Sequence, residues 1–483
     1  MTDPAPPSRG PHDVRSISGA FRLLASTSVL TLIFGIVTNK LVAVYAGPDG
    51  IASLTIYRNL TNFLIAAVSL GMTNVVIQRI STSRDDQEKR TVLVGLLRLV
   101  LAQVVVIVLV GLLLGPLVTS WMFESTADRV VGIRVAILFA IGVFTMQMAL
   151  EVLNGLTAVK QVSRVTLLTS FLTMATTYPL ICLGRVGIAM MLGLTCFAGT
   201  ALALRYITRA MPFSLRGAMR KEPFRWSGLP LSAPVAIRGI VTTGVLLLVQ
   251  SIISHGFGTN TLGVYTSAST LESNAVMLLV GFMRPYYLPS LGSFATEREK
   301  NAFANRVLEF LLVLAIPGIV ALVLLSPFVL ELLFSHAFAA GSDYLSILGI
   351  SMLAQTMLYT YGFYFVHRAA YRTILWIDCT WAVLLALGVG ACAWLHAPVT
   401  TLAWTYATSY VVYAVIYVSV GRRLFGADLL SRRNLLLATL GFGWLLLCYV
   451  VAHRSIGERL AFAGVTVVAF GSVALRARPL SAR

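Results

Sequence analysis

Residues 37–78, VTNKLVAVYAGPDGIASLTIYRNLTNFLIAAVSLGMTNVVIQ, decide the fold class. The segment holds the end of one long apolar run and the whole of a second, and a GPDG turn at residues 47–50 separates the two. About 20 apolar residues in helical conformation span the hydrocarbon core of a bilayer. Two such runs joined by a short turn therefore predict two consecutive membrane helices.

The remainder of the chain has the same character. Of its 483 residues, 57% are hydrophobic and only 12% are charged, and the mean hydropathy is +0.84. Soluble proteins are about 25% charged, so an ordinary soluble domain is excluded. Apolar runs bounded by glycine, proline and charged clusters predict an all-α polytopic membrane protein with about 14 transmembrane helices. The predicted spans are 23–46, 50–78, 91–122, 130–154, 165–184, 186–208, 229–254, 261–291, 307–330, 344–366, 373–395, 399–421, 434–452 and 460–475.

Basic residues are distributed unevenly between the predicted loops. The loops and tails on the side of the N-terminus contain 26 Lys or Arg, whereas the loops on the other side contain four. Because cytoplasmic loops of membrane proteins are enriched in Lys and Arg, both termini are predicted to be cytoplasmic. The excess of 37 Lys+Arg over 19 Asp+Glu then reflects membrane topology, and the bilayer rather than a nucleic acid is the expected partner.

A weak internal repeat divides the spans into two halves. At an offset of 211 residues, Gly47 aligns with Gly258 and Glu88-Lys89 aligns with Glu299-Lys300, and six of 43 positions are identical. Helix 8 then repeats helix 2 in the same orientation, which predicts two six-helix halves related by a pseudo-two-fold axis along the membrane normal. The predicted parts are an N-tail (1–22), an N-terminal lobe (23–208), an inter-lobe loop (209–228), a C-terminal lobe (229–421), two further helices (434–475) and a C-tail (476–483).

Two segments resemble motifs of a known superfamily. The segment EVLNGLTAVKQVSRVTLLTS, residues 151–170, resembles its LNG turn followed by basic residues, and residues 37–78 resemble its opening motif NK-hydrophobic-GP-x-G. With the predicted topology, these motifs resemble the multidrug/oligosaccharidyl-lipid/polysaccharide exporter superfamily, and within it the Wzx-type O-antigen translocases. The opening motif is carried by Asn39, Lys40, Gly47, Pro48 and Gly50.

The resemblance implies a flippase of the bacterial inner membrane. Such a protein moves an undecaprenyl-pyrophosphate-linked oligosaccharide from the cytoplasmic to the outer leaflet, for O-antigen, exopolysaccharide or capsule synthesis. It works by alternating access, with helices 1, 2, 7 and 8 around a central cavity. The partners expected on this basis are the lipid-linked glycan and other polysaccharide assembly proteins, and no cofactor is expected.

Charged side chains inside the spans mark a candidate substrate pathway. A charge at the bilayer centre costs about 2.5–3.5 kcal/mol on insertion scales, so such residues usually face protein or water. Helices 1, 2, 7 and 8 carry four basic residues and one acid, which predicts an electropositive cavity that favours a pyrophosphate over a cation. Asn62 shares one helical stripe with Thr55, Arg58 and Ser69. The candidate substrate-binding residues are Lys40, Arg58, Asn62, Arg238, Glu272 and Arg284.

Two acids, Glu272 and Asp378, are candidates for coupling transport to an ion gradient. Acids within membrane spans of transporters carry protons or bind cations. The structural alternatives are that Glu272 pairs with an arginine of a neighbouring helix, and that Asp378 pairs with Arg372 or a hydroxyl group. Lys40 has the alternative of reaching the outer membrane interface.

An aromatic cluster lies near the end of the predicted span 344–366. Its rings could stack on sugars, but a position near the end of a span favours an aromatic belt at the membrane interface. The cluster comprises Tyr359, Tyr361, Phe363, Tyr364 and Tyr371.

Three other functions compete with the flippase. A multidrug or cation antiporter and a lipid II flippase would share the fold, but the antiporter needs acids, and helices 1, 2, 7 and 8 contain Glu272 alone. The charge of the predicted cavity does not distinguish a lipid II flippase from an oligosaccharide flippase, because both cargoes carry a pyrophosphate. A membrane glycosyltransferase or polymerase needs positioned acids on substantial external loops, and the predicted external loops are short. We therefore predict a transporter and no catalytic or metal site, since the five cysteines lack metal-ligand spacing.

Overall fold

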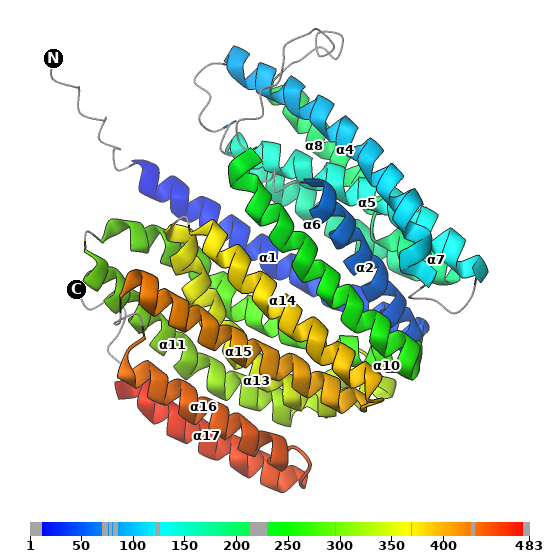
Figure 1. Ribbon diagram of the computed structural model, residues 1–483. Helices are drawn as coiled ribbons and strands as arrows, with labels where there is room; N and C mark the ends of the chain where they lie inside the picture. The colour runs from blue at the N-terminus through cyan, green and yellow to red at the C-terminus, as the bar shows by residue number, and fades with distance from the viewer. Residues whose placement is uncertain are drawn as a thin grey trace, which may run out of the picture. The chain divides into compact units, whose positions relative to one another are not determined.

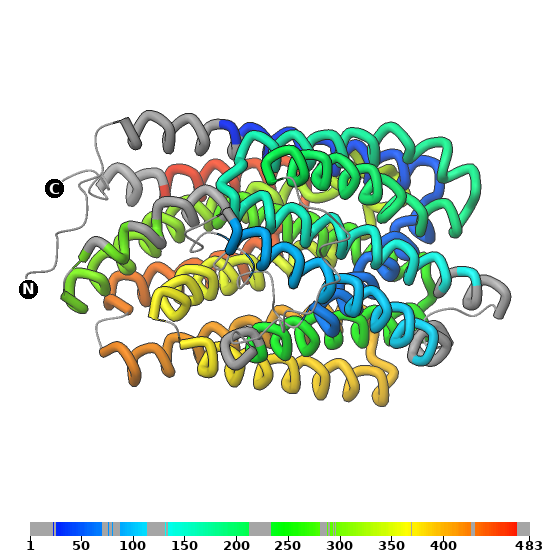
Figure 2. The backbone as a smooth tube through the Cα atoms, turned by 90° about the horizontal axis from the view of Figure 1, so that it is seen from above, coloured from blue at the N-terminus to red at the C-terminus, as the bar shows by residue number. Residues whose placement is uncertain are grey.

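The computed structural model describes residues 12–69, 76, 80, 86–120, 126–211, 229–294, 296–368, 370–426 and 430–476. Within these ranges every regular element is a helix and no strand occurs (Figures 1 and 2). This part of the chain contains 14 long helices, and ten of its segments are long and apolar enough to cross a membrane. The predicted all-α polytopic membrane fold is confirmed.

Helix boundaries differ from the predicted spans mainly where a helix extends beyond its apolar run. The helix predicted to begin at residue 307 begins at Glu297, because Thr296 and Glu299 form a capping box ahead of the apolar run. The helices are α1 (His12–Tyr45), α2 (Gly47–Ser69), α4 (Asp86–Ser120), α5 (Thr126–Gly155), α6 (Val159–Ile181), α7 (Gly184–Met191), α8 (Leu194–Ala210), α10 (Leu229–Ser293), α11 (Glu297–Leu324), α12 (Ser326–Leu333), a 3-10 turn (His336–Phe338), α13 (Gly341–His367), α14 (Tyr371–Trp394), α15 (Val399–Phe425), α16 (Arg432–Val451) and α17 (Ile456–Arg476).

The longest element, α10, is two helices joined at a bend. At about 1.5 Å per residue its 65 residues would extend about 100 Å, far more than one membrane crossing. Gly258 breaks the helical path with φ 86° and ψ 159°, between the two spans predicted for this segment. Gly47, its predicted repeat equivalent, also has a positive φ of 65°. The two glycines therefore open equivalent turns, as the repeat predicts for these positions.

The bend of α10 contacts the start of α2. The hydroxyl of Thr259 donates to a carboxylate oxygen of Asp49 at 2.5 Å. A Cβ atom at Gly263 would overlap the carbonyl group of Pro48. Only glycine therefore allows α10 to approach the backbone of α2 this closely.

The chain packs as two compact units. The first comprises Met1–Val42, Val68–Leu117 and Ala127–Ser232, and the second comprises Ala43–Ala67, Val118–Thr126 and Ala233–Arg483. Most of α2 thus belongs to the second unit, whereas the sequence assigns it to the N-terminal lobe. The predicted lobes stay a prediction.

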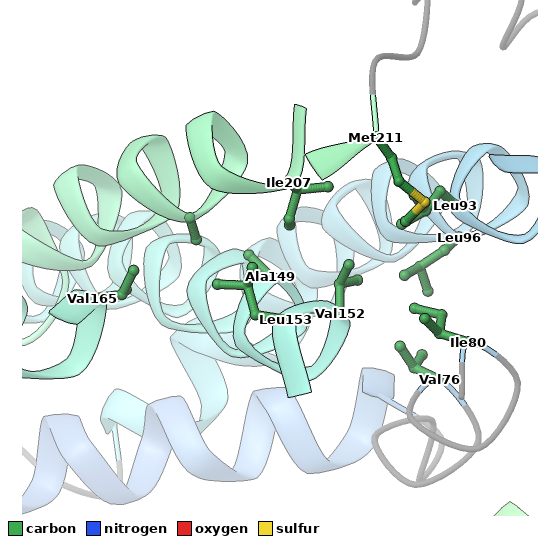
Figure 3. Packing of buried hydrophobic residues seen from close by; sticks show 11 residues of the cluster. Val76, Ile80, Leu93, Leu96, Ala149, Val152, Leu153, Val165, Ile207 and Met211 are labelled. Carbon is green, nitrogen blue, oxygen red and sulfur yellow. The ribbon is translucent and has the colours of Figure 1, made fainter. Parts of the chain in front are cut away.

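The first unit has a core of apolar side chains from α4, α5, α6 and α8 (Figure 3). Hydroxyl groups add polar links between the same helices. Thr173 on α6 and Thr195 on α8 lie 2.7 Å apart, and Thr145 on α5 and Thr200 on α8 lie 3.3 Å apart. The buried core residues are Val76, Ile80, Leu93, Leu96, Ala149, Val152, Leu153, Val165, Ala203, Ile207 and Met211.

In the second unit, α13 is the central helix. It packs against α11, α14, α15 and α16, and most of its residues are buried. Its buried residues include several that are polar, among them Ser351 and Gln355, whose hydrogen-bonding groups find partners within the bundle. The polar side chains that α13 buries inside the unit are therefore satisfied by hydrogen bonds.

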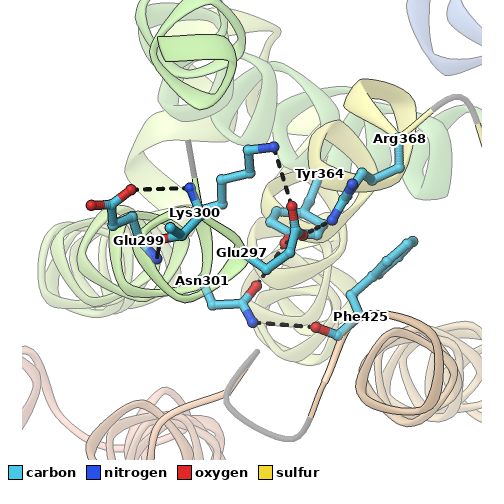
Figure 4. A network of polar contacts seen from close by, with 8 residues as sticks. Glu297, Glu299, Lys300, Asn301, Tyr364, Arg368 and Phe425 are labelled. Atoms are coloured by element: carbon cyan, nitrogen blue, oxygen red, sulfur yellow. Dashed lines mark hydrogen bonds and ion pairs between the residues drawn. The ribbon is translucent and has the colours of Figure 1, made fainter. Parts of the chain in front are cut away.

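Polar contacts join three helix ends of the second unit (Figure 4). Glu297 at the start of α11 forms an ion pair with Arg368, which follows α13. The hydroxyl of Tyr364 donates to Asn301 at 2.7 Å, and the amide of Asn301 donates to the carbonyl oxygen of Phe425 at 3.3 Å. These bonds fix one end of α11, α13 and α15 against one another.

Replacement of Gly263 by alanine should destabilise the protein, because the added methyl group would overlap the Pro48 carbonyl. Gly318→Ala is the matched control, since a Cβ atom there meets no atom within 4 Å. It should leave stability unchanged or raise it by up to about 1 kcal/mol, the helix propensity difference between glycine and alanine. Thermal unfolding in detergent micelles measures both effects. Equal midpoints for the two variants would contradict the close approach of α2 and α10.

Candidate functional site

A cavity of about 520 Å³ lies inside the second unit, between α10, α13, α14 and α15. Small-molecule sites typically measure about 300–1,000 Å³, so the cavity could hold a ligand group. Its lining is rich in aromatic side chains, and Arg238 is the one charged residue among the described residues that line it. The lining residues are Val235, Arg238, Gly239, Thr242, Leu246, Gln355, Leu358, Tyr359, Gly362, Phe363, Val366, Ile374, Trp381, Tyr410, Tyr413 and Tyr417.

Arg238 on α10 forms an ion pair with Asp378 on α14, through its Nε and the carboxylate Oδ2. The two partners differ in access: the Arg238 side chain is 47% exposed and that of Asp378 is 0% exposed. The cationic partner therefore faces the cavity and the anionic partner lies behind it. A guanidinium presents several N–H donors in a planar fork, a geometry that suits phosphate and carboxylate groups.

Asp378 has a second partner, because the hydroxyl of Tyr413 on α15 donates to its Oδ1. Buried charges are tolerated when they are paired and hydrogen-bonded, and these two contacts meet that condition. The predicted hydroxyl partner is confirmed. The alternative partner Arg372 is wrong: it lies six residues away on α14, which places it on a different helical face, and it is exposed.

Tyrosines on α15 form one wall of the cavity. Tyr410, Tyr413 and Tyr417 line the cavity, and together with Tyr406 they follow steps of 4, 3 and 4 along one helical face. Trp381 on α14 stacks on Tyr413 with ring centroids 5.4 Å apart. The sequence predictions missed this wall, although its spacing was visible in the sequence.

The α13 aromatics add a second wall. Tyr359 and Phe363 line the cavity, whereas Tyr361 and Tyr364 are buried inside the unit. The expected aromatic belt at the membrane interface is therefore wrong for Tyr361 and Tyr364, which are buried, and stays a prediction for the other rings. The helix turns one pair toward the cavity and the other pair into the bundle.

Glu272, on the second part of α10, is buried next to α13. The hydroxyl of Ser351 and the amide of Gln355 donate to its Oε1, the latter at 2.6 Å. Among the described residues Oε2 has no hydrogen-bond partner and no arginine pairs with this carboxylate, so the predicted alternative of an ion pair finds no support in this part of the chain. Gln355 also lines the cavity and thus connects Glu272 to the cavity wall.

The other predicted substrate residues lie apart from this cavity. Arg58 and Asn62 are exposed on α2 and are not among its lining residues. They share a helical stripe with Ala66, which faces Gly239 of α10. Lys40 is half-buried on α1, in the first unit. The backbone of Arg284 is helical, but its side chain lies outside the described part of the structure.

Residues 48–343 match the family described as polysaccharide biosynthesis protein, and the match covers more than half of the chain. The chain belongs to this family. The match includes Arg238 and Glu272, and it ends before Asp378 and the tyrosines of α15. No curated protein matches the sequence.

Solved structures of the MOP (multidrug/oligosaccharidyl-lipid/polysaccharide) superfamily share the fold. The lipid II flippase MurJ, in an inward closed conformation, has a TM-score of 0.67 at 14% identity, with 94% of this chain and 99% of that chain covered. An inward-facing multidrug resistance MATE family transporter has a TM-score of 0.63 at 16% identity, with 85% and 98% covered. A MOP superfamily transporter from Pyrococcus furiosus, described by the reverse polarity of its binding pocket, has a TM-score of 0.55 at 14% identity, with 89% and 94% covered. These structures confirm the fold that the predicted superfamily implies.

Tyr413→Phe should destabilise the protein by about 1–3 kcal/mol, because a buried carboxylate would lose a hydrogen-bond donor. Tyr406→Phe is the matched control, since the hydroxyl of Tyr406 is hydrogen-bonded to the neutral hydroxyl of Tyr410, at 3.5 Å, and not to a carboxylate among the described residues. Unfolding in detergent micelles compares them. A smaller effect for Tyr413→Phe than for Tyr406→Phe would contradict the role of Tyr413 as a partner of Asp378.

Proposed function

We propose that this protein is a flippase that moves an undecaprenyl-pyrophosphate-linked oligosaccharide from the cytoplasmic to the outer leaflet of the bacterial inner membrane. The observation that carries the proposal is the cavity whose described lining has Arg238 as its one charged residue and aromatic side chains as its walls. The guanidinium matches a pyrophosphate, and the aromatic rings offer flat apolar faces to sugar rings. The family assignment supports a role in polysaccharide synthesis. The polymer proposed is O-antigen, exopolysaccharide or capsule.

Other predicted residues extend the proposed pathway. Lys40, Arg58 and Arg284 add positive charge along the spans, and Asn62 adds an amide on the same face as Arg58. A field of one sign in a low-dielectric environment raises the local concentration of an anionic substrate. We assign these residues to attraction of the headgroup and Arg238 to its direct binding.

Glu272 and Asp378 are the proposed sites of ion coupling. Glu272 is a buried carboxylate with two neutral donors and no counterion among the described residues, which suits a group that gains and loses a proton. Its contact with Gln355 provides a route by which a change at Glu272 would reach the cavity. We propose that both termini lie in the cytoplasm, because the loops on their side of the membrane carry most of the Lys and Arg residues.

A lipid II flippase is the second candidate, because the fold of MurJ covers nearly the whole chain and the name of that protein specifies a lipid carrier. A drug antiporter has less support, since the charged group in the cavity lining is a cation. The length of the glycan that is transported separates the first two candidates. A family assignment to polysaccharide synthesis favours the oligosaccharide.

The direct test of the proposed function is reconstitution into liposomes with a fluorescent polyprenyl-pyrophosphate glycan. The double variant Arg238→Gln/Asp378→Asn removes both charges, so no lone charge is left buried. Transport should fall about 10- to 100-fold, since a hydrogen bond to a charged group contributes about 1.5–3 kcal/mol. Arg134→Ala, on an exposed arginine of α5, is the control and should transport normally. Wild-type transport by the double variant would overturn the proposal.

A second test fills the cavity at Gly362 on α13. A Cβ atom at this residue meets nothing within 4 Å, so Gly362→Ala should fold and transport normally. Gly362→Phe places a ring in the cavity and should strongly reduce transport without lowering stability, because the ring occupies open space. The same liposome assay measures both variants. Full transport by a folded Gly362→Phe variant would exclude this cavity from the substrate path.

A further inference from the structure

The ion pair at the cavity is asymmetric in a way that bears on substrate binding. The guanidinium of Arg238 is half exposed in the cavity, and its partner Asp378 is completely buried. An anion that enters the cavity therefore reaches Arg238 and not Asp378. Such an anion and the Asp378 carboxylate would compete for the same cation.

Among the described residues, no second cation lies close enough to Asp378 to form an ion pair with it. Facing it are Arg238 on α10, and Tyr413 on α15 with Tyr410 and Tyr417 on the same helix. Its own helix contributes Cys379, and Tyr359 on α13 lies near Arg238. If Arg238 left Asp378 to bind another anion, the described groups around Asp378 would be neutral hydroxyls. A buried carboxylate in that position becomes stable by taking up a proton.

The geometry of Arg238 allows it to exchange the Asp378 carboxylate for an anion from the cavity. The ion pair with Asp378 runs through its Nε, and 47% of the side chain is exposed. The guanidinium carries five N–H donors, so a diphosphate could bind the terminal nitrogens from the cavity side before the contact with Asp378 breaks. Exchange by this route avoids a step in which Arg238 has no counterion.

We infer that Asp378 is a built-in competing anion, which holds Arg238 while the cavity is empty and is displaced when the diphosphate of the substrate binds. The inference rests on the proposed function and specifies how its binding site works. On displacement, Asp378 accepts one proton from water. While the cavity is empty, the charges of Arg238 and Asp378 balance, so the empty protein can return to its starting conformation without a bound anion. Diphosphate binding and protonation of Asp378 favour each other.

The direction in which pH changes the affinity for diphosphate follows from the coupling between diphosphate binding and protonation of Asp378. Protonation of Asp378 frees Arg238, so diphosphate affinity should rise as the pH falls, by at most tenfold per pH unit for a single proton. The arginine and the tyrosines keep their protonation between pH 5.5 and 7.5. The diphosphate itself gains protons and loses charge as the pH falls, which would weaken binding. An increase in affinity at low pH therefore identifies the protein group.

The test is calorimetric binding of inorganic pyrophosphate, and of farnesyl pyrophosphate as a lipid-linked form, to the full chain in detergent. Titrations in buffers of different ionisation enthalpy count the protons taken up. The wild type should take up protons on binding. Asp378→Asn, which keeps the shape of the side chain, should bind at least tenfold more tightly at pH 7.5 and should take up fewer protons. Asp343→Asn, an exposed acid at the start of α13, is the control and should behave as the wild type.

The outcomes separate this inference from the proposed function. If Arg238→Gln/Asp378→Asn loses pyrophosphate binding but Asp378→Asn binds no more tightly than the wild type, Asp378 is not a competitor and the inference alone fails. If the double variant binds like the wild type, the cavity is not the anion site and the proposed function fails with it. The number of protons taken up is a second, independent readout. If the wild type and Asp378→Asn take up the same number of protons on binding, the inference is also overturned.

Discussion

The pairing of Arg238 with Asp378 is the constraint on which the arrangement of the second unit depends. Both residues lie in membrane helices, where an unpaired charge is costly. The pair and the hydroxyl of Tyr413 join α10, α14 and α15 at one point. That point borders the cavity, so the contacts that stabilise the unit also present a cation to whatever enters it.

The central position of α13 links this site to a second buried acid. Gln355 donates to Glu272 on one side and lines the cavity on the other. At the far end of α13, Tyr364 and the adjacent Arg368 join α11 through Asn301 and Glu297 (Figure 4). The helix α13 therefore carries the hydrogen-bond partners of a buried proton-binding candidate, one wall of the cavity and a polar joint to α11. A change in protonation and a change in helix packing would act on the same element.

The sequence was sufficient for the fold and for part of the site. Apolar runs and loop charges predict the helices because the bilayer imposes a length on each span. Arg238, Glu272 and Asp378 stand out because charges are rare there. The partners of these residues depend on how the helices pack, so the sequence did not show that Asp378 pairs with Arg238, or that Ser351 and Gln355 donate to Glu272. The tyrosines of α15 were missed because aromatic residues are common in membrane helices and only packing places them on a cavity.

The central claim is that Arg238 binds the anionic headgroup inside the cavity of the second unit. An electron cryo-microscopy structure of the protein in lipid nanodiscs with a polyprenyl-pyrophosphate glycan tests it most directly. The expected result is diphosphate density within hydrogen-bonding distance of the Arg238 guanidinium, with glycan density along Tyr359 and the α15 tyrosines. Glycan-lipid density bound elsewhere, with Arg238 still paired to Asp378 beside an empty cavity, would contradict the claim.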